Sequence, residues 1–284
     1  MTQPLALFHS LRQVAEQQDW QYIYPVWSRR AQGLSIGINL HPNHCCNWHC
    51  IYCQVPGLQR GASPEIDMPR LQDELTACLD WLTEHLPAAS LAVSDYVQDI
   101  AFAGDGEPTT SPQFSAALSC VQQLLSQKPE ADRPARVRLI TNGSQMHLAT
   151  TQQAMHVLQQ MEGEVWFKLD AGNDAEMLTV NDARLPLSLH LQRLKACSQL
   201  CPTWVQTAVM QRRVENKLVT TPSLDGYIEA LQPFKENIAG ILLYSIARAS
   251  QQDTQASIQT PDLSLLQRYA AALQARGFNV RVFA

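Results

Sequence analysis

Residues 45–54 read Cys-Cys-Asn-Trp-His-Cys-Ile-Tyr-Cys-Gln, and this stretch decides how the chain is interpreted. Cys46, Cys50 and Cys53 have the spacing Cys-x3-Cys-x2-Cys, so three thiols lie within eight residues. Cysteine thiolates are the usual ligands of iron–sulfur clusters, and a [4Fe–4S] cluster commonly takes four of them. Three ligands without an obvious fourth leave one iron open to a small molecule, which favours chemistry over a purely structural role.

Two other uses of these cysteines are weighed against the cluster. A structural zinc site has four closed ligands, often in two separate halves, and Cys45, His44 or His49 could supply the fourth. Disulfides would need an oxidising compartment. A non-catalytic metal-binding or redox-sensing protein therefore stays an alternative, and the spacing does not settle the role of Cys45.

Composition predicts one globular domain spanning residues 1–284. The chain has 284 residues, of which 45% are hydrophobic and 17% charged, enough for one large core. The N-terminus shows no signal-peptide pattern and no run approaches 18 apolar residues, so we expect no membrane span. Eight cysteines without an export signal predict reduced thiols and a cytoplasmic protein.

The net charge of −5 counts against a large nucleic-acid footprint, because phosphate binding relies on Lys and Arg. Local basic patches are the alternative, and solvated surface charge is the favoured interpretation of each. The candidates are Arg29–Arg30, Arg133 with Arg136 and Arg138, and Arg212–Arg213.

Short β-rich runs alternate with amphipathic helical stretches, which predicts βαβ units and a parallel sheet. The expected strands are residues 34–40, 99–103, 137–140, 165–169, 204–209 and 240–246, with 278–283 as an added edge strand. The expected helices are residues 67–86, 113–127, 145–161, 187–200, 224–231 and 263–276. Because parallel barrels carry their sites on the loops after the strands, the motifs there should converge on one rim.

The cysteine spacing, with Tyr52 directly before the last cysteine, resembles the radical S-adenosylmethionine (radical SAM) superfamily. The resemblance implies a partial (β/α)6 barrel with its core at about 34–250, flanked by N- and C-terminal extensions. It also implies that Cys46, Cys50 and Cys53 hold a [4Fe–4S] cluster whose open iron binds S-adenosylmethionine (SAM). One electron, from a donor such as flavodoxin or ferredoxin, would cleave SAM to a 5′-deoxyadenosyl radical. That radical would abstract hydrogen from an unidentified substrate.

The same resemblance assigns SAM contacts to the loops after the strands. Gly104-Asp105-Gly106-Glu107-Pro108 resembles the glycine-rich motif that contacts the aminopropyl part of SAM, and glycines also suit a plain turn. Thr141 and Asn142 are candidate contacts to the SAM carboxylate or ribose; alternatively, this segment is a turn in which Ser144 caps the next helix. Catalytic residues are not assigned.

Further candidates lie at the ends of the later strands. Lys168 and Asp170 share a side by strand alternation, and they could bind SAM or form a structural ion pair. Gln206 could face the lumen or be satisfied by the backbone. Arg248 could hold a carboxylate or lie in a surface salt bridge. The other cysteines are interpreted as buried small hydrophobes: Cys78, Cys120, Cys197 and Cys201.

The order of these motifs is similar to proteins related to the wyosine tRNA-base synthase. This chain departs from that pattern, because it lacks a second cysteine set, has no flavodoxin-like extension and is acidic. A small molecule, peptide or protein is therefore the slightly preferred substrate, and tRNA is the alternative. A glycyl-radical-enzyme activase is a further alternative within the superfamily.

Overall fold

An eight-stranded sheet forms the centre of the fold, in the order β1-β2-β5-β6-β7-β8-β11-β13. The computed structural model describes residues 3–215, 217–253 and 257–283. Within the described part of this eight-stranded sheet, only the β1–β2 pair is antiparallel, and the other neighbouring pairs are parallel. The strands are β1 (Ile23–Ser28), β2 (Gly33–Ile38), β5 (Val97–Phe102), β6 (Val137–Thr141), β7 (Glu164–Lys168), β8 (Thr203–Ala208), β11 (Gly240–Tyr244) and β13 (Val280–Phe283).

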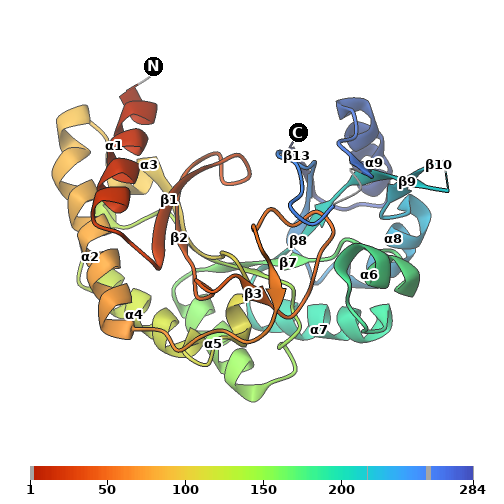
Figure 1. Cartoon of the computed structure of the whole chain (residues 1–284), viewed down its shortest axis with the longest axis horizontal. Helices are drawn as coiled ribbons and strands as arrows, with labels where there is room; N and C mark the ends of the chain where they lie inside the picture. Colours follow the sequence, from red (N-terminus) through yellow and green to blue (C-terminus); the bar gives the residue numbers. More distant parts are fainter. Residues whose placement is uncertain (1–2, 216, 254–256, 284) are drawn as a thin grey trace.

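The helices lie around the outside of this curled sheet, which stays open on one side (Figure 1). They are α1 (Gln3–Gln17), α2 (Met68–His85), α3 (Val93–Tyr96), α4 (Phe114–Ser126), α5 (Ala149–Gln160), α6 (Asp174–Asn181), α7 (Leu187–Leu200), α8 (Leu224–Leu231) and α9 (Leu263–Ala275). Two small sheets are added to this frame. One pairs β9 (Met210–Val214) with β10 (Lys217–Thr221) and β12 (Ile258–Gln259), and the other pairs β3 (Cys45–Cys46) with β4 (Gln59–Arg60).

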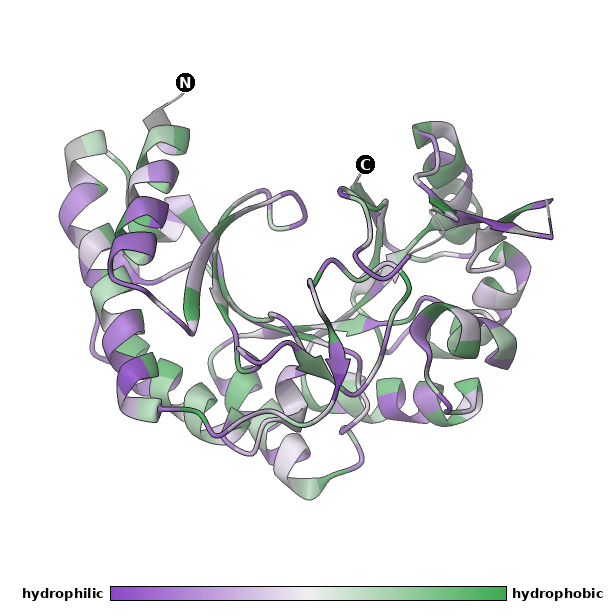
Figure 2. Ribbon diagram, in the orientation of Figure 1, coloured by the Kyte–Doolittle hydropathy of each residue, from purple (hydrophilic) through white to green (hydrophobic). Residues whose placement is uncertain are grey.

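The two faces of the sheet bury different residues, because side chains alternate along each strand. On β7, Val165 and Phe167 are fully buried in the main core, which continues into the apolar sides of the helices. Trp166 points the other way and packs with Trp204 and Leu242 in a separate cluster. Hydrophilic and hydrophobic residues interleave along the outer helices, as expected for one buried side (Figure 2). The concave face is thus the aromatic and polar one.

The predicted partial barrel is confirmed. The six expected parallel strands form in order, and the C-terminal edge strand pairs with β11 through Ile241 and Val280. Sequence reasoning missed β1, whose run is interrupted by Pro25. Proline is tolerated here because β1 is an edge strand, where an N–H need not pair. The small sheet of β9, β10 and β12 and helices α1, α3 and α6 were also not predicted.

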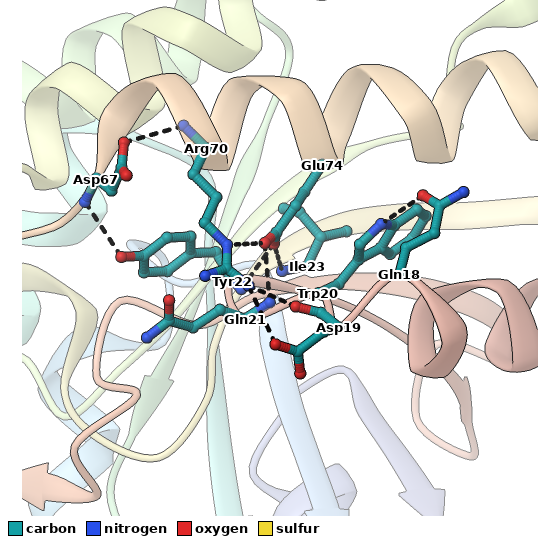
Figure 3. Close-up of polar contacts among 9 residues, drawn as sticks. All are labelled: Gln18, Asp19, Trp20, Gln21, Tyr22, Ile23, Asp67, Arg70 and Glu74. Carbon is teal, nitrogen blue, oxygen red and sulfur yellow. Dashed lines mark hydrogen bonds and ion pairs between the residues drawn. The ribbon is translucent and has the colours of Figure 1, made fainter.

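A buried carboxylate holds β1 to the rest of the fold (Figure 3). Glu74 of α2 is only 6% exposed. Its two oxygens accept hydrogen bonds from the backbone N–H groups of Gln21, Tyr22 and Ile23, at 2.9, 2.8 and 3.1 Å. Arg70 Nε donates to the same carboxylate at 2.8 Å. The start of the edge strand is therefore fixed to the middle of a helix by a charge that the helical pattern did not reveal.

Candidate cofactor site

The cysteine loop follows β2 and is held from two sides. On one side, His49 N and Ile51 N donate to backbone carbonyls at the end of α6, at 3.2 and 2.9 Å. On the other, Gln251 N donates to the Cys53 carbonyl at 2.9 Å. Cys50 is buried, and Cys46 and Cys53 are half-buried. The loop thus lies between the end of α6 and the segment that follows β11.

The three thiols are close enough to affect one another. Burial, together with the nearby charges of Glu107, Cys50 and Cys53 and against the backbone N–H of Trp48, raises the pKa of Cys46 to about 12. Burial also raises the pKa of Cys50, whereas Lys168 and Asn181 act to lower it. Several thiolates gathered without a cation are unfavourable, and metal binding would offset that cost.

Three thiols on one loop have the donor chemistry that iron–sulfur clusters use. Across the residues that the structure describes, no group of three His, Cys, Asp or Glu side chains could hold one metal ion. A structural zinc ion needs four such ligands around one point. In a [4Fe–4S] cluster each cysteine binds a different iron, so its ligands are spread further apart. Three neighbouring thiols on one loop suit that arrangement.

The glycine-rich loop after β5 lies against the cysteine loop. Gly106 has no room for a side chain, since a Cβ there would lie 2.2 Å from the Cys45 carbonyl oxygen and 2.5 Å from the His41 ring. Gly104 has φ +156°, and a Cβ would lie 2.3 Å from Asn39 Oδ1. Glycine is needed at both positions because the two loops approach so closely. The predicted convergence of these loops is confirmed.

Asn39, which sequence reasoning missed, joins the loops after β2 and β5. Its Oδ1 accepts hydrogen bonds from His41 N and Asp105 N, at 3.0 and 3.1 Å. Its Nδ2 donates to Asp105 Oδ2 at 2.8 Å. The Asp105 carboxylate also lies 3.6 Å from His44 Nε2. Asp105 is therefore engaged in fixing the loops, whatever it contacts when a ligand is bound.

Glu107 ties the loop after β5 to the loop after β6. It is 3% exposed, and its carboxylate accepts hydrogen bonds from Thr109 N, Thr109 Oγ1, Thr141 Oγ1 and Asn142 N, at 3.2, 2.5, 2.5 and 2.6 Å. Burial raises the pKa of Glu107, while these donors act to lower it. Four donors therefore occupy this carboxylate, and they come from both loops.

Asn142 connects the loop after β6 to the cysteine loop. Its Nδ2 donates to Asn47 Oδ1 at 2.9 Å, and Asn47 Nδ2 donates to Ser144 Oγ at 2.7 Å. Ser144 does not cap a helix, because α5 begins only at Ala149. The helix-cap alternative for this segment is therefore wrong. Four loops, after β2, β5, β6 and β7, meet at one rim.

The end of β7 supplies a polar cluster beside Cys50. Tyr52 Oη donates a short hydrogen bond to Asp170 Oδ2, and Ala208 N donates to Asp170 Oδ1 at 2.8 Å. Lys168 Nζ lies 3.8 Å from Asp170 Oδ2 and 4.5 Å from the centroid of the Tyr52 ring. The ion pair weighed for Lys168 and Asp170 is present, and the Lys168 charge acts on Cys50. Burial raises the pKa of Tyr52, so its hydroxyl stays protonated as the donor.

Asn181 completes this cluster and was not predicted from the sequence. It is fully buried at the end of α6, and its Nδ2 donates to Asp170 Oδ2 at 3.1 Å and to Cys50 Sγ at 3.4 Å. No local pattern marks it, because α6 itself was not predicted and the partner cysteine is far away in the sequence.

Comparison with solved structures identifies the architecture. A radical SAM methyltransferase from Sphaerobacter thermophilus superposes with a TM-score of 0.59 and 14% identity, over 88% of this chain and 66% of that one. TYW1 with a lysine–pyruvate adduct bound gives 0.57 and 12%, over 94% and 89%. A mutant of spore photoproduct lyase gives 0.53 and 10%, over 84% and 74%.

This chain has the radical SAM fold. The chain spans just under two thirds of the methyltransferase chain. No protein-family profile matches the sequence. These structural likenesses, all at 14% identity or below, concern the fold.

One curated protein matches part of the sequence. A stretch of 123 residues is 30% identical to the GTPase Obg of Brachyspira hyodysenteriae, covering 43% of this chain but only 15% of that protein. The sequence contains no Gly-Lys pair and therefore no phosphate-binding loop of the Gly-x4-Gly-Lys-Ser/Thr type. This partial match does not bear on the radical SAM fold.

Two residues predicted to contact SAM, Gln206 and Arg248, lie on or after the last strands of the barrel. Gln206 pairs in register with Lys168, and its Oε1 is buried with no described partner. Arg248 lies exposed after β11, where its carbonyl accepts from Gln54 Nε2 at 3.1 Å. The roles of Gln206 and Arg248 toward SAM stay predictions. So do those of the other candidates: Tyr52, Gly104, Asp105, Gly106, Glu107, Thr141, Asn142, Lys168 and Asp170.

The four cysteines outside the cysteine loop pack within or against the core, as expected. Cys78 and Cys197 are fully buried in α2 and α7, and Cys201 is 3% exposed. Cys120 is half-buried on α4. Cys45 lies against Gly61, where a built Cβ would be 3.0 Å from its Sγ. In the described part of the chain, no helix has the length and apolarity needed to cross a membrane.

The candidate basic patches are not alike. Arg138 is not a surface charge, because it bonds Asp99 and lies 2.6 Å from Glu164 Oε1 on the concave face. Arg30, from the β1–β2 turn, reaches across that face to within 4.8 Å of the centroid of the Tyr244 ring. The predicted grouping of Arg138 with Arg133 and Arg136 is therefore wrong.

Proposed function

We propose that this protein is a radical SAM enzyme. The observation that carries the proposal is the set of three neighbouring thiols, Cys46, Cys50 and Cys53, on a rim where four strand-end loops are hydrogen-bonded together. When bound, a reduced [4Fe–4S] cluster would supply the one electron that splits SAM into methionine and a 5′-deoxyadenosyl radical, and this radical would take one hydrogen atom from the substrate.

The residues of the chain have distinct tasks in this proposal. The three cysteines hold the cluster. Backbone groups of the Gly104–Pro108 loop face the aminopropyl part of SAM, because glycine allows close approach. Asn142 and Gln206 offer amide groups to its carboxylate or ribose. Lys168, with Asp170 and Tyr52, forms the charged side of the site next to Cys50.

The proposal needs an external electron, because SAM cleavage consumes one and no described residue supplies it. A small reductant of the flavodoxin or ferredoxin class is the proposed partner. Cofactor enzymes protect reactive intermediates by excluding water. The substrate or a partner protein would then cover the open side of the curled sheet (Figure 1) and exclude water from the site.

For the substrate, we prefer a small molecule, peptide or protein over tRNA. The chain carries a net charge of −5, and the cations of the concave face are partly neutralised, as Arg138 is by Asp99 and Glu164. Wyosine-like tRNA modification remains the second candidate, supported by the motif order and by the TYW1 fold likeness. Activation of a glycyl-radical enzyme is the third.

The test is anaerobic reconstitution followed by a SAM-cleavage assay with dithionite as reductant. We expect slow release of 5′-deoxyadenosine without substrate, and none from the Cys46→Ala, Cys50→Ala, Cys53→Ala triple variant. The matched control is the Cys78→Ala, Cys197→Ala double variant, which removes buried thiols away from the rim. A wild-type protein that binds iron but never cleaves SAM would favour the metal-binding or redox-sensing alternative.

A separate filter-binding measurement decides between the substrate classes. Binding of total tRNA is measured from low to high salt, because phosphate contacts weaken steeply as salt is added. Tight, salt-sensitive binding would overturn the preference for a small molecule, peptide or protein. Absence of binding at low salt would remove tRNA modification.

A further inference from the structure

One amide group reaches the sulfur of a candidate cluster ligand. Asn181 is fully buried, and its Nδ2 lies 3.4 Å from Cys50 Sγ. The backbone around Cys50 is fixed to the same helix end, since His49 N donates to the Asn181 carbonyl at 3.2 Å and Ile51 N donates to the preceding carbonyl at 2.9 Å. The backbone carbonyls at this helix end and the Asn181 side chain therefore both fix the position of Cys50.

Asp170 determines which end of the amide faces the sulfur. Asn181 Nδ2 lies 3.1 Å from Asp170 Oδ2, an oxygen that also accepts from Tyr52 and lies 3.8 Å from Lys168 Nζ. Two oxygens at 3.1 Å would repel, so the amide nitrogen must occupy this side. The NH2 group has two N–H donors, and the second is left for Cys50 Sγ. Asn181 Oδ1 is buried without a described partner, so it does not compete for this orientation.

We propose that Asn181 raises the reduction potential of the cluster by donating an N–H···S hydrogen bond to Cys50. This inference rests on the proposed function above. The reduced cluster carries one more negative charge than the oxidised cluster, so a donor to a ligand sulfur stabilises the reduced form more. Hydrogen bonds to the sulfurs are among the factors that set cluster potentials.

The three cysteines differ in this respect. Cys46 is approached by the backbone N–H of Trp48, which no substitution removes cleanly. Its Sγ also lies 3.8 Å from Asn47 Oδ1, which is an acceptor. Within the described chain, Asn181 is the side chain that donates to one of these sulfurs. It is uncharged, so its replacement tests the hydrogen bond without changing the net charge of the site.

The experiment is a redox titration of the anaerobically reconstituted full chain, without SAM, followed by electron paramagnetic resonance. Wild type is compared with Asn181→Leu, which is similar in size but has no donor, and with Asn181→Ser, whose hydroxyl is too short to reach the sulfur. We expect the midpoint potential of the cluster to be more negative in both variants than in wild type. A tenfold lower equilibrium constant for reduction corresponds to about 59 mV for a one-electron couple.

The matched control loosens the same helix without touching Cys50. Asn173 caps α6, since its Oδ1 accepts from Glu176 N at 2.9 Å, and its side chain is exposed. Asn173→Ala should keep the wild-type potential while lowering thermal stability. Iron content and circular dichroism are recorded for every variant, so that loss of the cluster is separated from a shift in its potential.

The outcomes separate this inference from the function on which it rests. A wild-type potential in an Asn181 variant that retains its cluster overturns the tuning role and leaves the proposed function standing. Loss of the cluster in both Asn181 variants, but not in Asn173→Ala, would assign Asn181 to holding the loop and would equally overturn the tuning role. A wild-type protein that binds no cluster would remove the proposed function and this inference together.

Discussion

The Glu107 carboxylate accepts a 2.6 Å hydrogen bond from the backbone N–H of Asn142, which joins the loop after β5 to the loop after β6. The carboxylate accepts three further hydrogen bonds, two from Thr109 and one from Thr141. A residue expected to contact SAM is therefore also the support of two loops that meet the cysteine loop. The rim depends on such cross-strand contacts between loop residues that are far apart in sequence.

Replacing Glu107 should loosen this junction. In Glu107→Gln an amide nitrogen would face donors, so we expect the free energy of unfolding to fall by about 2 kcal/mol and SAM affinity to fall as well. Urea denaturation and equilibrium dialysis with SAM measure the two effects. Glu65→Gln, at an exposed position, is the charge-matched control. An unchanged free energy of unfolding in Glu107→Gln would contradict the role of this carboxylate in joining the loops after β5 and β6.

Gly106→Val should weaken SAM binding while leaving the cluster in place. The added side chain would meet the Cys45 carbonyl and the His41 ring, and would push the loop after β5 away from the cysteine loop. SAM binding and iron content of the reconstituted protein are the measurements. Ala62→Val, in an exposed loop, controls for a larger side chain. Wild-type SAM affinity in Gly106→Val would argue that this loop does not contact SAM.

Glu74→Leu should destabilise the whole protein without affecting the rim directly. It removes an acceptor for three backbone N–H groups and for Arg70, and breaking a buried charged network of this kind costs about 3 kcal/mol. Chemical denaturation gives the change in the free energy of unfolding. Glu84→Leu on the exposed side of the same helix is the control. A loss below about 1 kcal/mol would show that this network contributes little.

The free energy of unfolding should fall when the pH is lowered from the unfolded-state pKa of two buried histidines, His41 and His190, to their folded-state pKa. Burial lowers the pKa of His41 and of His190 to about 4 in the folded protein, below the ordinary value of about 6.5. The unfolded chain then binds more protons between about pH 6.5 and 4, so the free energy of unfolding decreases as the pH falls through this window. Each pKa unit corresponds to about 1.4 kcal/mol.

Denaturation curves of His41→Gln across this window check the prediction, because the substitution removes one of the two contributions. The variant should show a weaker pH dependence than wild type, whereas His147→Gln, at an exposed site, should not. Identical slopes in wild type and His41→Gln would contradict the assignment of a neutral buried imidazole to His41.

The sequence predicted the frame of the fold better than the connections that build the site. The parallel strands appear as apolar runs, and helices such as Leu187–Leu200 and Leu224–Leu231 begin and end where the pattern predicted. β1 was missed because Pro25 interrupts it, and β9 was missed because Arg212 and Arg213 look like part of a polar loop. In each case tertiary context overrides a local preference.

The site residues divide in a similar way. Cysteines and glycines carry spacing that can be recognised, so the cysteine loop and the loop after β5 were found. Asn39, Asn47 and Asn181 were missed, because a single asparagine in a loop or at a helix end is indistinguishable from an ordinary turn residue. Their partners lie 66, 95 and 131 residues away in the sequence. Only the folded chain shows these contacts.

The central claim is that Cys46, Cys50 and Cys53 hold a [4Fe–4S] cluster with one iron open to SAM. The most direct test is electron paramagnetic resonance of the reduced, anaerobically reconstituted protein, with and without SAM, alongside iron analysis. We predict about four irons per chain, as this cluster type requires, and a signal whose shape changes when SAM is added. A colourless protein that takes up zinc and rejects iron, or a cluster signal that SAM leaves unchanged, would contradict the account.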